Sequence, residues 1–214
     1  MTELTGGPKP TRWDRHLGGA ESAYSRTFEG LIERGEDIDG EARLADVLAP
    51  RAARILDAGA GMGRVATALV RRGHDVTAVE KDSHLVARSR ELFPEVAVVE
   101  ADLLALTAPL LEAAGRPAEY DVIVLVGNVL VYLAEDTEVA ALSALADLLA
   151  PGGRILAGFH PRNGPPHSHA YPVEDFRRDA EAAGLQIDQL FGSYDLHPPT
   201  EDYVVAVLAA ASPR

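Results

Sequence analysis

The chain has 214 residues, of which 47% are hydrophobic and 25% charged, with no cysteine and a formal net charge of −13. This length and composition predict one globular domain with a core of its own. The absence of cysteine excludes disulfides and thiolate metal sites and favours a cytoplasmic setting. Met1 to Arg12 has no apolar segment of the kind a signal peptide carries, and no apolar run approaches the roughly 18 residues of a membrane span. Because strong negative charge repels phosphate backbones, we expect a small-molecule partner and no nucleic-acid or membrane partner. The oligomeric state cannot be read from the sequence.

The residues before the first predicted strand divide into two parts. Residues 1–12 are rich in glycine and proline and predict a flexible tail. Residues 13–50 predict a helical cap, made of an amphipathic helix up to Gly35 and a second helix that ends at Pro50. Trp13, Tyr24 and Phe28 either pack the first helix onto the core or belong to a lid that excludes water. We expect residues 51–214 to form the remaining core of this single domain.

A strand, a glycine turn and a helix follow at residues 54–71. The apolar run Arg54 to Leu56 ends at Asp57, and glycines then stand at alternate positions: Gly59, Gly61 and Gly63. Glycine lets the backbone turn sharply and lets a ligand approach closely. The helix N-terminus that follows favours negative charge, and Asp57 stands at the carboxyl end of the strand, where open α/β sheets bind ligands.

The glycine spacing argues against a dinucleotide. A dinucleotide fingerprint reads Gly-x-Gly-x-x-Gly with a small last residue, whereas Arg64 occupies that last position here. Asp57 would repel a pyrophosphate, but it suits a ligand that carries an ammonium group. A purely structural turn in another kind of α/β protein is the alternative.

The next two predicted strands also end in acids. Glu80 ends the strand Asp75–Glu80 and is placed to accept hydrogen bonds from ribose hydroxyls; an exposed loop carboxylate is the alternative. After a helix over residues 82–93, the strand Val96–Val99 leads to Asp102. That aspartate either contacts a ligand or caps the short helix that follows.

The second half continues the alternation of helices and strands. A continuous apolar run, Val122 to Val126, predicts a central parallel strand and leads to Gly127-Asn128. The side-chain oxygen of Asn128 either points to the cofactor or to a substrate hydrogen, or it caps the next turn. A helix over 137–149 ends in a Pro-Gly-Gly turn at residues 150–154, before a strand over 155–159.

The loop over residues 160–175 contains His160, His167 and His169. Their spacing does not favour a metal site, and we predict none. Because His160 directly follows a strand at the ligand-binding edge, it is a weak candidate for a general base; the alternative is that it only shapes a pocket. A helix over 174–183 and two strands over 185–194 and 203–210, arranged as a hairpin, complete the chain.

These motifs carry a family resemblance. Asp57-x-Gly59-x-Gly61-x-Gly63 resembles the first motif of class I S-adenosylmethionine-dependent methyltransferases, and residues 120–124 with Gly127-Asn128 resemble the fourth-strand motif of small-molecule members. The resemblance covers roughly residues 50–210. It implies an α/β fold with a doubly wound, mostly parallel seven-stranded sheet of order 3-2-1-4-5-7-6, one antiparallel strand and an N-terminal helical lid. One departure is that the common cysteine and threonine of the first motif are here Ala60 and Met62.

The resemblance also implies the roles of individual residues. Asp57 would hold the methionine amine of S-adenosylmethionine, directly or through water, Glu80 would hold the ribose, and Asp102 with Leu103 would contact adenine. The implied cofactor-binding residues are Asp57, Gly59, Ala60, Gly61, Met62, Glu80, Lys81, Asp102, Leu103, Gly127 and Asn128. No residue has a firm catalytic assignment; His160 and Tyr24 are weak candidates.

The function that we expect is methyl transfer from S-adenosylmethionine to a small molecule by in-line displacement. Two alternatives remain. A non-catalytic S-adenosylmethionine-binding protein would carry the same motifs. A nicotinamide-dependent oxidoreductase is disfavoured by the glycine spacing, by Asp57 and by the absence of a Tyr-x-x-x-Lys pair.

Overall fold

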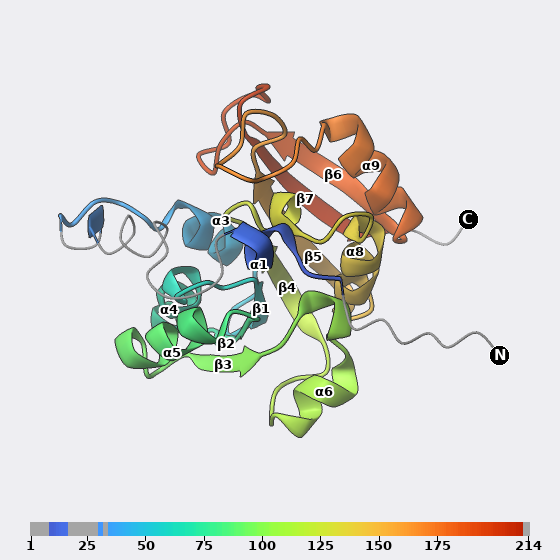
Figure 1. Cartoon of the computed structure of the whole chain (residues 1–214). Helices are drawn as coiled ribbons and strands as arrows, with labels where there is room; N and C mark the ends of the chain where they lie inside the picture. Colours follow the sequence, from blue (N-terminus) through green and yellow to red (C-terminus); the bar gives the residue numbers. More distant parts are fainter. Residues whose placement is uncertain (1–8, 17–29, 32–33, 212–214) are drawn as a thin grey trace.

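The structure is a computed structural model that describes residues 9–16, 30–31 and 34–211 (Figure 1). The described residues form one seven-stranded sheet of order β3-β2-β1-β4-β5-β7-β6, which confirms the predicted order. The strands are β1 Arg54–Ala58, β2 Asp75–Glu80, β3 Ala97–Glu100, β4 Tyr120–Leu125, β5 Leu149–Phe159, β6 Leu185–Phe191 and β7 Val204–Ala210. Strand β7 runs antiparallel to the other six strands and pairs with β5 on one side and with β6 on the other.

Helices cover both faces of the sheet. They are α1 Arg12–His16, α3 Gly40–Leu48, α4 Arg64–Arg71, α5 Ser83–Leu92, η1 Leu103–Ala105, α6 Ala108–Ala113, α7 Val129–Tyr132, α8 Glu138–Ala146 and α9 Val173–Ala182. In Figure 1, α3, α4 and α5 lie towards the β1–β3 half of the sheet, whereas α8 and α9 lie towards β5–β7. None of the helices that the structure describes is long and apolar enough to cross a membrane.

The central strand β4 explains why the sheet is covered on both faces. Its apolar residues are buried without alternation, as in a parallel strand with helices on either side. Val122 and Val124 pack in a cluster with α3 and α4, while Ile123 and Leu125 pack in a second cluster with α8 and α9. These two cores hold the carboxyl ends of β1, β2, β4 and β5 together at one edge.

The predicted boundaries around residue 150 were wrong. The helix predicted over 137–149 is α8, which ends at Ala146. The turn predicted at residues 150–154 is part of β5, which begins at Leu149 instead of residue 155. Leu149 pairs with Tyr120 and Arg154 pairs with Val122, so the strand accommodates the intervening residues in a register shift. Gly153 makes this possible, because a Cβ there would lie 2.9 Å from the carbonyl oxygen of Ala150 and 3.0 Å from that of Tyr120.

The sequence predicts two helices before the first strand, and the structure describes parts of this region. The second predicted helix is α3, which ends at Leu48 before Pro50. Within the first predicted helix, the structure describes α1, helical residues 30–31 and a turn at 34–35, and the residues Tyr24 and Phe28 lie outside the described residues. Residues 9–12 fall within the predicted tail, yet Lys9 donates to the Glu135 carbonyl at 3.3 Å.

Candidate active site

A cavity of about 630 Å³ opens at the carboxyl edge of the sheet. It collects residues from the glycine turn, from the ends of β2 and β3, from the loops after β4 and β5, and from the β6–β7 connection. The predicted site residues that line it are Gly59, Gly61, Glu80, Lys81, Asp102, Leu103, Gly127, Asn128 and His160. Three others, Asp57, Ala60 and Met62, are buried behind the turn and do not line the cavity. Tyr24 lies outside the described residues.

The glycine turn needs its glycines for packing as well as for dihedral angles. Gly59 has a φ of +79°, and a Cβ there would lie 2.5 Å from a methyl carbon of Val129 in α7. Gly63 has a φ of +84° at the N-cap of α4, and a Cβ there would lie 2.6 Å from the hydroxyl of Ser89. The turn therefore packs closely between α7 and α5 and exposes its backbone to the cavity.

Asp57 is a buried carboxyl with unused hydrogen-bonding capacity. Its side chain is buried, and its Oδ2 atom has no hydrogen-bond partner among the described residues. Burial raises the pKa of Asp57 to about 7, against the opposing charge of Arg64 and a backbone hydrogen bond from Ala66. A buried acceptor without a donor is costly, and a ligand ammonium group would supply both the donor and the charge.

Glu80 is held rigidly at the end of β2. Its Oε2 accepts from the backbone N–H of Gly61 at 2.9 Å, and its Oε1 accepts from those of Lys81 at 2.8 Å and Asp82 at 2.9 Å. Burial raises the pKa of Glu80, whereas these backbone donors oppose the shift. A carboxylate has about four acceptor positions, so capacity remains for a hydroxyl group in the cavity.

Asp102 has the capping role that the sequence left open as an alternative. Its Oδ1 accepts from the backbone N–H of Leu104 at 3.0 Å and so caps η1. Its Oδ2 accepts from the ammonium group of Lys81 at 2.7 Å. Capping and lining the cavity are compatible, and the adenine contact of Asp102 and Leu103 stays a prediction.

Arg64 occupies the position that would be a small residue in a dinucleotide fingerprint. Both of its terminal nitrogens donate to the two carboxylate oxygens of Glu41 in α3, and Nη1 also donates to the Ile38 carbonyl at 2.6 Å. The two side chains are 10% and 14% exposed, respectively. Both line the cavity, so this ion pair forms part of its wall.

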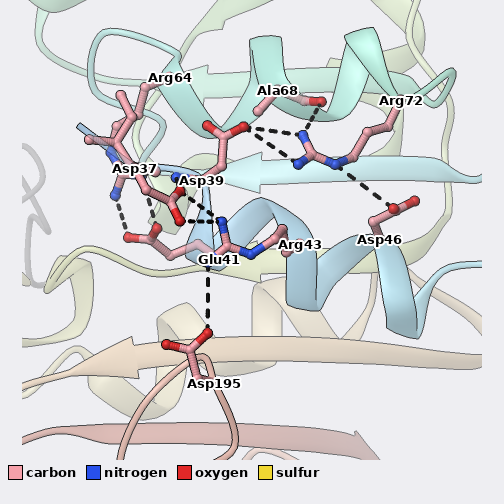
Figure 2. A network of polar contacts seen from close by, with 10 residues as sticks. Asp37, Asp39, Glu41, Arg43, Asp46, Arg64, Ala68, Arg72 and Asp195 are labelled. Carbon is pink, nitrogen blue, oxygen red and sulfur yellow. Dashed lines mark hydrogen bonds and ion pairs between the residues drawn. The ribbon is translucent and has the colours of Figure 1, made fainter. Parts of the chain in front are cut away.

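The surrounding charges fasten α3 to the rest of the core (Figure 2). Arg43 of α3 pairs with Asp37 at 2.7 Å and reaches Asp195 of the β6–β7 connection at 3.7 Å. Arg72, at the C-terminal end of α4, pairs with Asp39 at the N-cap of α3 at 3.4 Å and with Asp46 in the last turns of α3 at 3.8 Å. Helix α3 is thus joined by ion pairs both to the end of α4 and to the β6–β7 connection.

The comparisons with known proteins agree with this geometry. A family model described as a methyltransferase domain matches residues 55–153. A TehB-like S-adenosylmethionine-dependent methyltransferase structure from Corynebacterium glutamicum is 36% identical, with a TM-score of 0.75 over 87% of this chain and 96% of that one. The chain belongs to the class I S-adenosylmethionine-dependent methyltransferases. The family's cofactor is S-adenosylmethionine, and the unpartnered Oδ2 of Asp57 and the glycine turn fit it.

More distant members show how widely the fold is shared. A 1,6-didemethyltoxoflavin-N1-methyltransferase from Burkholderia thailandensis has a TM-score of 0.59 at 19% identity, over 92% of this chain and 94% of its own. A curated relative, ribosomal RNA small subunit methyltransferase A of Porphyromonas gingivalis, is 39% identical over 71 residues. That match covers 32% of this chain and only 28% of the relative's length.

An N-terminal strap (residues 9–16) crosses the mouth of the methyltransferase cavity. The sequence did not predict its contacts with the core. On the β2 side, Asp14 accepts from the ammonium group of Lys81 at 2.7 Å, and the indole of Trp13 donates to Asp82 at 2.9 Å. On the α7 side, Arg12 donates to the Leu133 carbonyl at 2.6 Å. Figure 1 shows its helix α1 in front of the middle of the sheet. Periodicity gives no signal for such contacts between distant segments.

The loops after β4 and β5 are joined by a side-chain hydrogen bond. Asn128 has a φ of +74° at the N-cap position of α7, but its side chain makes no cap hydrogen bond. Instead, its Oδ1 accepts from the backbone N–H of His160 at 2.9 Å and contacts His160 Nδ1 at 3.0 Å. The oxygen that was predicted to point to the cofactor, to a substrate or to the next turn is therefore engaged by His160.

The other two histidines of the loop lie apart from this pair. His169 contacts the Val131 carbonyl through Nδ1 at 2.9 Å and Glu138 through Nε2 at 3.2 Å, and His167 does not line the cavity. Within the part of the chain that the structure describes, no group of three or more potential ligand side chains is placed to hold a metal ion.

Proposed function

We propose that this protein transfers a methyl group from S-adenosylmethionine to an uncharged small organic molecule. The observation that supports this most directly is the composition of the cavity at the carboxyl edge of the sheet. Eight of the eleven residues implied in cofactor binding share that cavity with a wall of tyrosine, proline and histidine side chains. Its volume, about 630 Å³, is in the range of pockets that enclose small organic ligands.

The cofactor side of the proposal rests on two carboxylates with unused acceptor capacity, the unpartnered Oδ2 of Asp57 and the remaining acceptor position of Glu80. Asp57 would take the ammonium group, and Glu80 would accept from the ribose with its remaining lone pair. When bound, S-adenosylmethionine supplies a methyl group made electrophilic by the positive sulfur. The residues of this chain then have to hold the acceptor atom in line with that methyl group and keep water away.

The acceptor side of the proposal rests on the remaining wall of the cavity. Its aromatic members are Tyr132, Tyr194, Tyr203 and, from the N-terminal strap, Trp13. Its charged members Glu41 and Arg64 neutralise each other. A wall with aromatic faces and no net charge favours an uncharged, ring-containing acceptor. The N-terminal strap covers the mouth and would exclude water during transfer.

Ribosomal RNA, the substrate named for the curated relative, is a less favourable acceptor. The shared stretch is 71 residues long, and the net charge of −13 gives no general attraction for a phosphate backbone. A protein that only binds S-adenosylmethionine remains as the second candidate, because methyl transfer needs no diagnostic catalytic pair.

Calorimetric titration tests the cofactor, and a turnover assay tests the transfer. S-adenosylhomocysteine should bind with micromolar affinity, NADH should not bind, and the Asp57→Ala, Glu80→Ala double variant should lose binding. Radiolabelled methyl groups should pass to members of a panel of uncharged phenols, hydroxylated heterocycles and aromatic amines. Binding without transfer to any member would instead identify a non-catalytic binding protein, and no binding by the folded protein would refute the cofactor.

A further inference from the structure

We infer that His160 is the general base of the transfer, with its Nε2 atom as the proton acceptor, and that Asn128 is the positioning residue that fixes this tautomer. The inference rests on the proposed function and adds a substrate class to it. The acceptor would be a molecule whose attacking atom carries a proton at neutral pH, such as a phenol or another ring hydroxyl.

The backbone settles which atom of Asn128 faces His160. The main-chain N–H of His160 can only donate, and it lies 2.9 Å from the Asn128 side chain. The atom that faces it must therefore be the amide oxygen and not the nitrogen. That same oxygen lies 3.0 Å from His160 Nδ1. Because a carbonyl oxygen only accepts, Nδ1 must carry the hydrogen.

The position of the hydrogen on Nδ1 determines the state of the other ring nitrogen, Nε2. In neutral imidazole only one nitrogen carries a hydrogen, so the lone pair of His160 is at Nε2. Among the residues that the structure describes, none forms a hydrogen bond with Nε2, and the side chain lines the cavity. His160 thus presents an acceptor, and not a donor, to whatever occupies the cavity.

The surroundings of His160 keep its ring neutral and oriented. The ring packs edge-on against Tyr203, with centroids 4.7 Å apart. Burial lowers the pKa of His160, and the charge of Asp202, next to Tyr203 in the β6–β7 connection, opposes this shift only in part. The hydroxyl of Tyr203 is engaged with that of Tyr194 at 2.9 Å.

The backbone at Asn128 explains why an amide serves here. Residue 128 has a φ of +74°, a conformation that asparagine adopts more readily than most residues. Its own N–H donates to the Gly158 carbonyl at 3.1 Å, which holds the loop after β4 against the end of β5. The left-handed backbone and the side-chain bridge together fix the position of His160 relative to the loop after β4.

The proton balance of the step is simple. The acceptor hydroxyl loses its proton to His160 Nε2 as its oxygen takes the methyl group, and the cofactor leaves as a neutral thioether. His160 then carries the positive charge and returns the proton to solvent. A nucleophile without a proton, such as a tertiary amine, would need no such base.

The first test reads the tautomer without turnover. Two-bond ¹H–¹⁵N spectra of ¹⁵N-histidine protein, loaded with S-adenosylhomocysteine, should show His160 as the Nδ1–H tautomer at neutral pH. Its signals are identified by their loss in His160→Gln. The ring should titrate below 6.5, the ordinary pKa of histidine. An Nε2–H tautomer or an imidazolium at neutral pH would overturn the inference.

Variants of Asn128 separate positioning from packing. Asn128→Asp keeps an acceptor and adds a charge, so the pKa of His160 should rise by about 1–2 units. Asn128→Gly keeps the left-handed backbone but removes the acceptor, so the Nδ1–H tautomer should no longer dominate. If neither variant changes the titration or the tautomer of His160, then Asn128 does not position it.

The second test uses turnover on the same panel of acceptors. His160→Gln should lower transfer to phenols by about 100-fold or more while the affinity for S-adenosylhomocysteine stays unchanged. His167→Gln, in the exposed part of the same loop, should behave like wild type. The wild-type rate should fall at low pH with the midpoint that the spectra give for His160, and the Asn128→Asp variant should shift that midpoint upwards. Undiminished transfer by His160→Gln overturns the base, whereas a wild-type enzyme that methylates nothing overturns the proposed function itself.

Discussion

Replacing Asp57 by asparagine should make the ligand-free protein more stable at alkaline pH. The pKa of this carboxyl rises from 3.8 to about 7 when burial strips its water. A group whose folded pKa is raised keeps a proton longer in the folded state, so stability falls as pH rises between the two values. The difference of roughly three pH units corresponds to about 4 kcal/mol, a large part of the stability of an ordinary domain.

Urea denaturation of the ligand-free proteins measures this effect. Asp57→Asn and wild type should differ little near about pH 4, and the variant should be more stable by up to about 4 kcal/mol at about pH 8. Asp121→Asn is a matched control on the neighbouring strand. The guanidinium of Arg54 lowers the pKa of Asp121, so that variant should be less stable than wild type at neutral pH and should lose this deficit in acid.

The ionised carboxylate of Asp57 should lower the stability of the ligand-free protein and should raise its affinity for the cofactor. An ammonium group beside Asp57 favours its ionised form, so the affinity of wild type for S-adenosylhomocysteine should weaken as pH falls below about 7. Asp57→Asn should bind weakly at every pH. The reasoning is refuted if Asp57→Asn is no more stable than wild type at alkaline pH, or if the stability difference does not change with pH.

Three further variants test the walls of the cavity. Gly59→Ala should lower the free energy of unfolding by about 2 kcal/mol or more and should also weaken cofactor binding, because its Cβ would lie 2.5 Å from a methyl carbon of α7 at a positive φ. Urea denaturation measures the first effect and calorimetry the second. Glu41→Gln should cost about 3 kcal/mol in urea denaturation, because it leaves the largely buried guanidinium of Arg64 without its carboxylate; a change within error would show that the pair is solvated. Lys81→Met should release the N-terminal strap, so the fluorescence of Trp13, the only tryptophan, should become easier to quench with acrylamide, and unchanged quenching would contradict the role of Lys81.

The sequence was informative wherever local chemistry decides the structure. The glycine turn was predictable because Gly59 and Gly63 need positive φ angles and leave no room for a Cβ. The position of Glu80 was predictable because an acid at the end of the second strand lies beside that turn in this topology, and its Oε2 accepts from the Gly61 N–H. The contact of Glu80 with a ribose stays a prediction.

Contacts between distant segments could not be predicted from the sequence. The strap joins Asp14 to Lys81 and Arg12 to the carbonyl of Leu133, and these pairs are 67 and 121 residues apart. Such contacts depend on where whole loops settle after the sheet has formed, and neither spacing nor propensity encodes that. The contact of Asn128 with His160 was missed for the same reason, although both residues had been singled out.

The place of β7 imposes an order on assembly. This last strand lies between β5 and β6, so until it is made, β5 has an open edge and β6 has no partner in the sheet. Tyr203, which packs against His160, enters the cavity on the same segment. During synthesis, the half of the sheet from β1 to β4 can form early, whereas the wall that we assign to the acceptor closes only with the final strand. A ribosome-stalled chain that stops before residue 203 should therefore bind the cofactor without enclosing an acceptor.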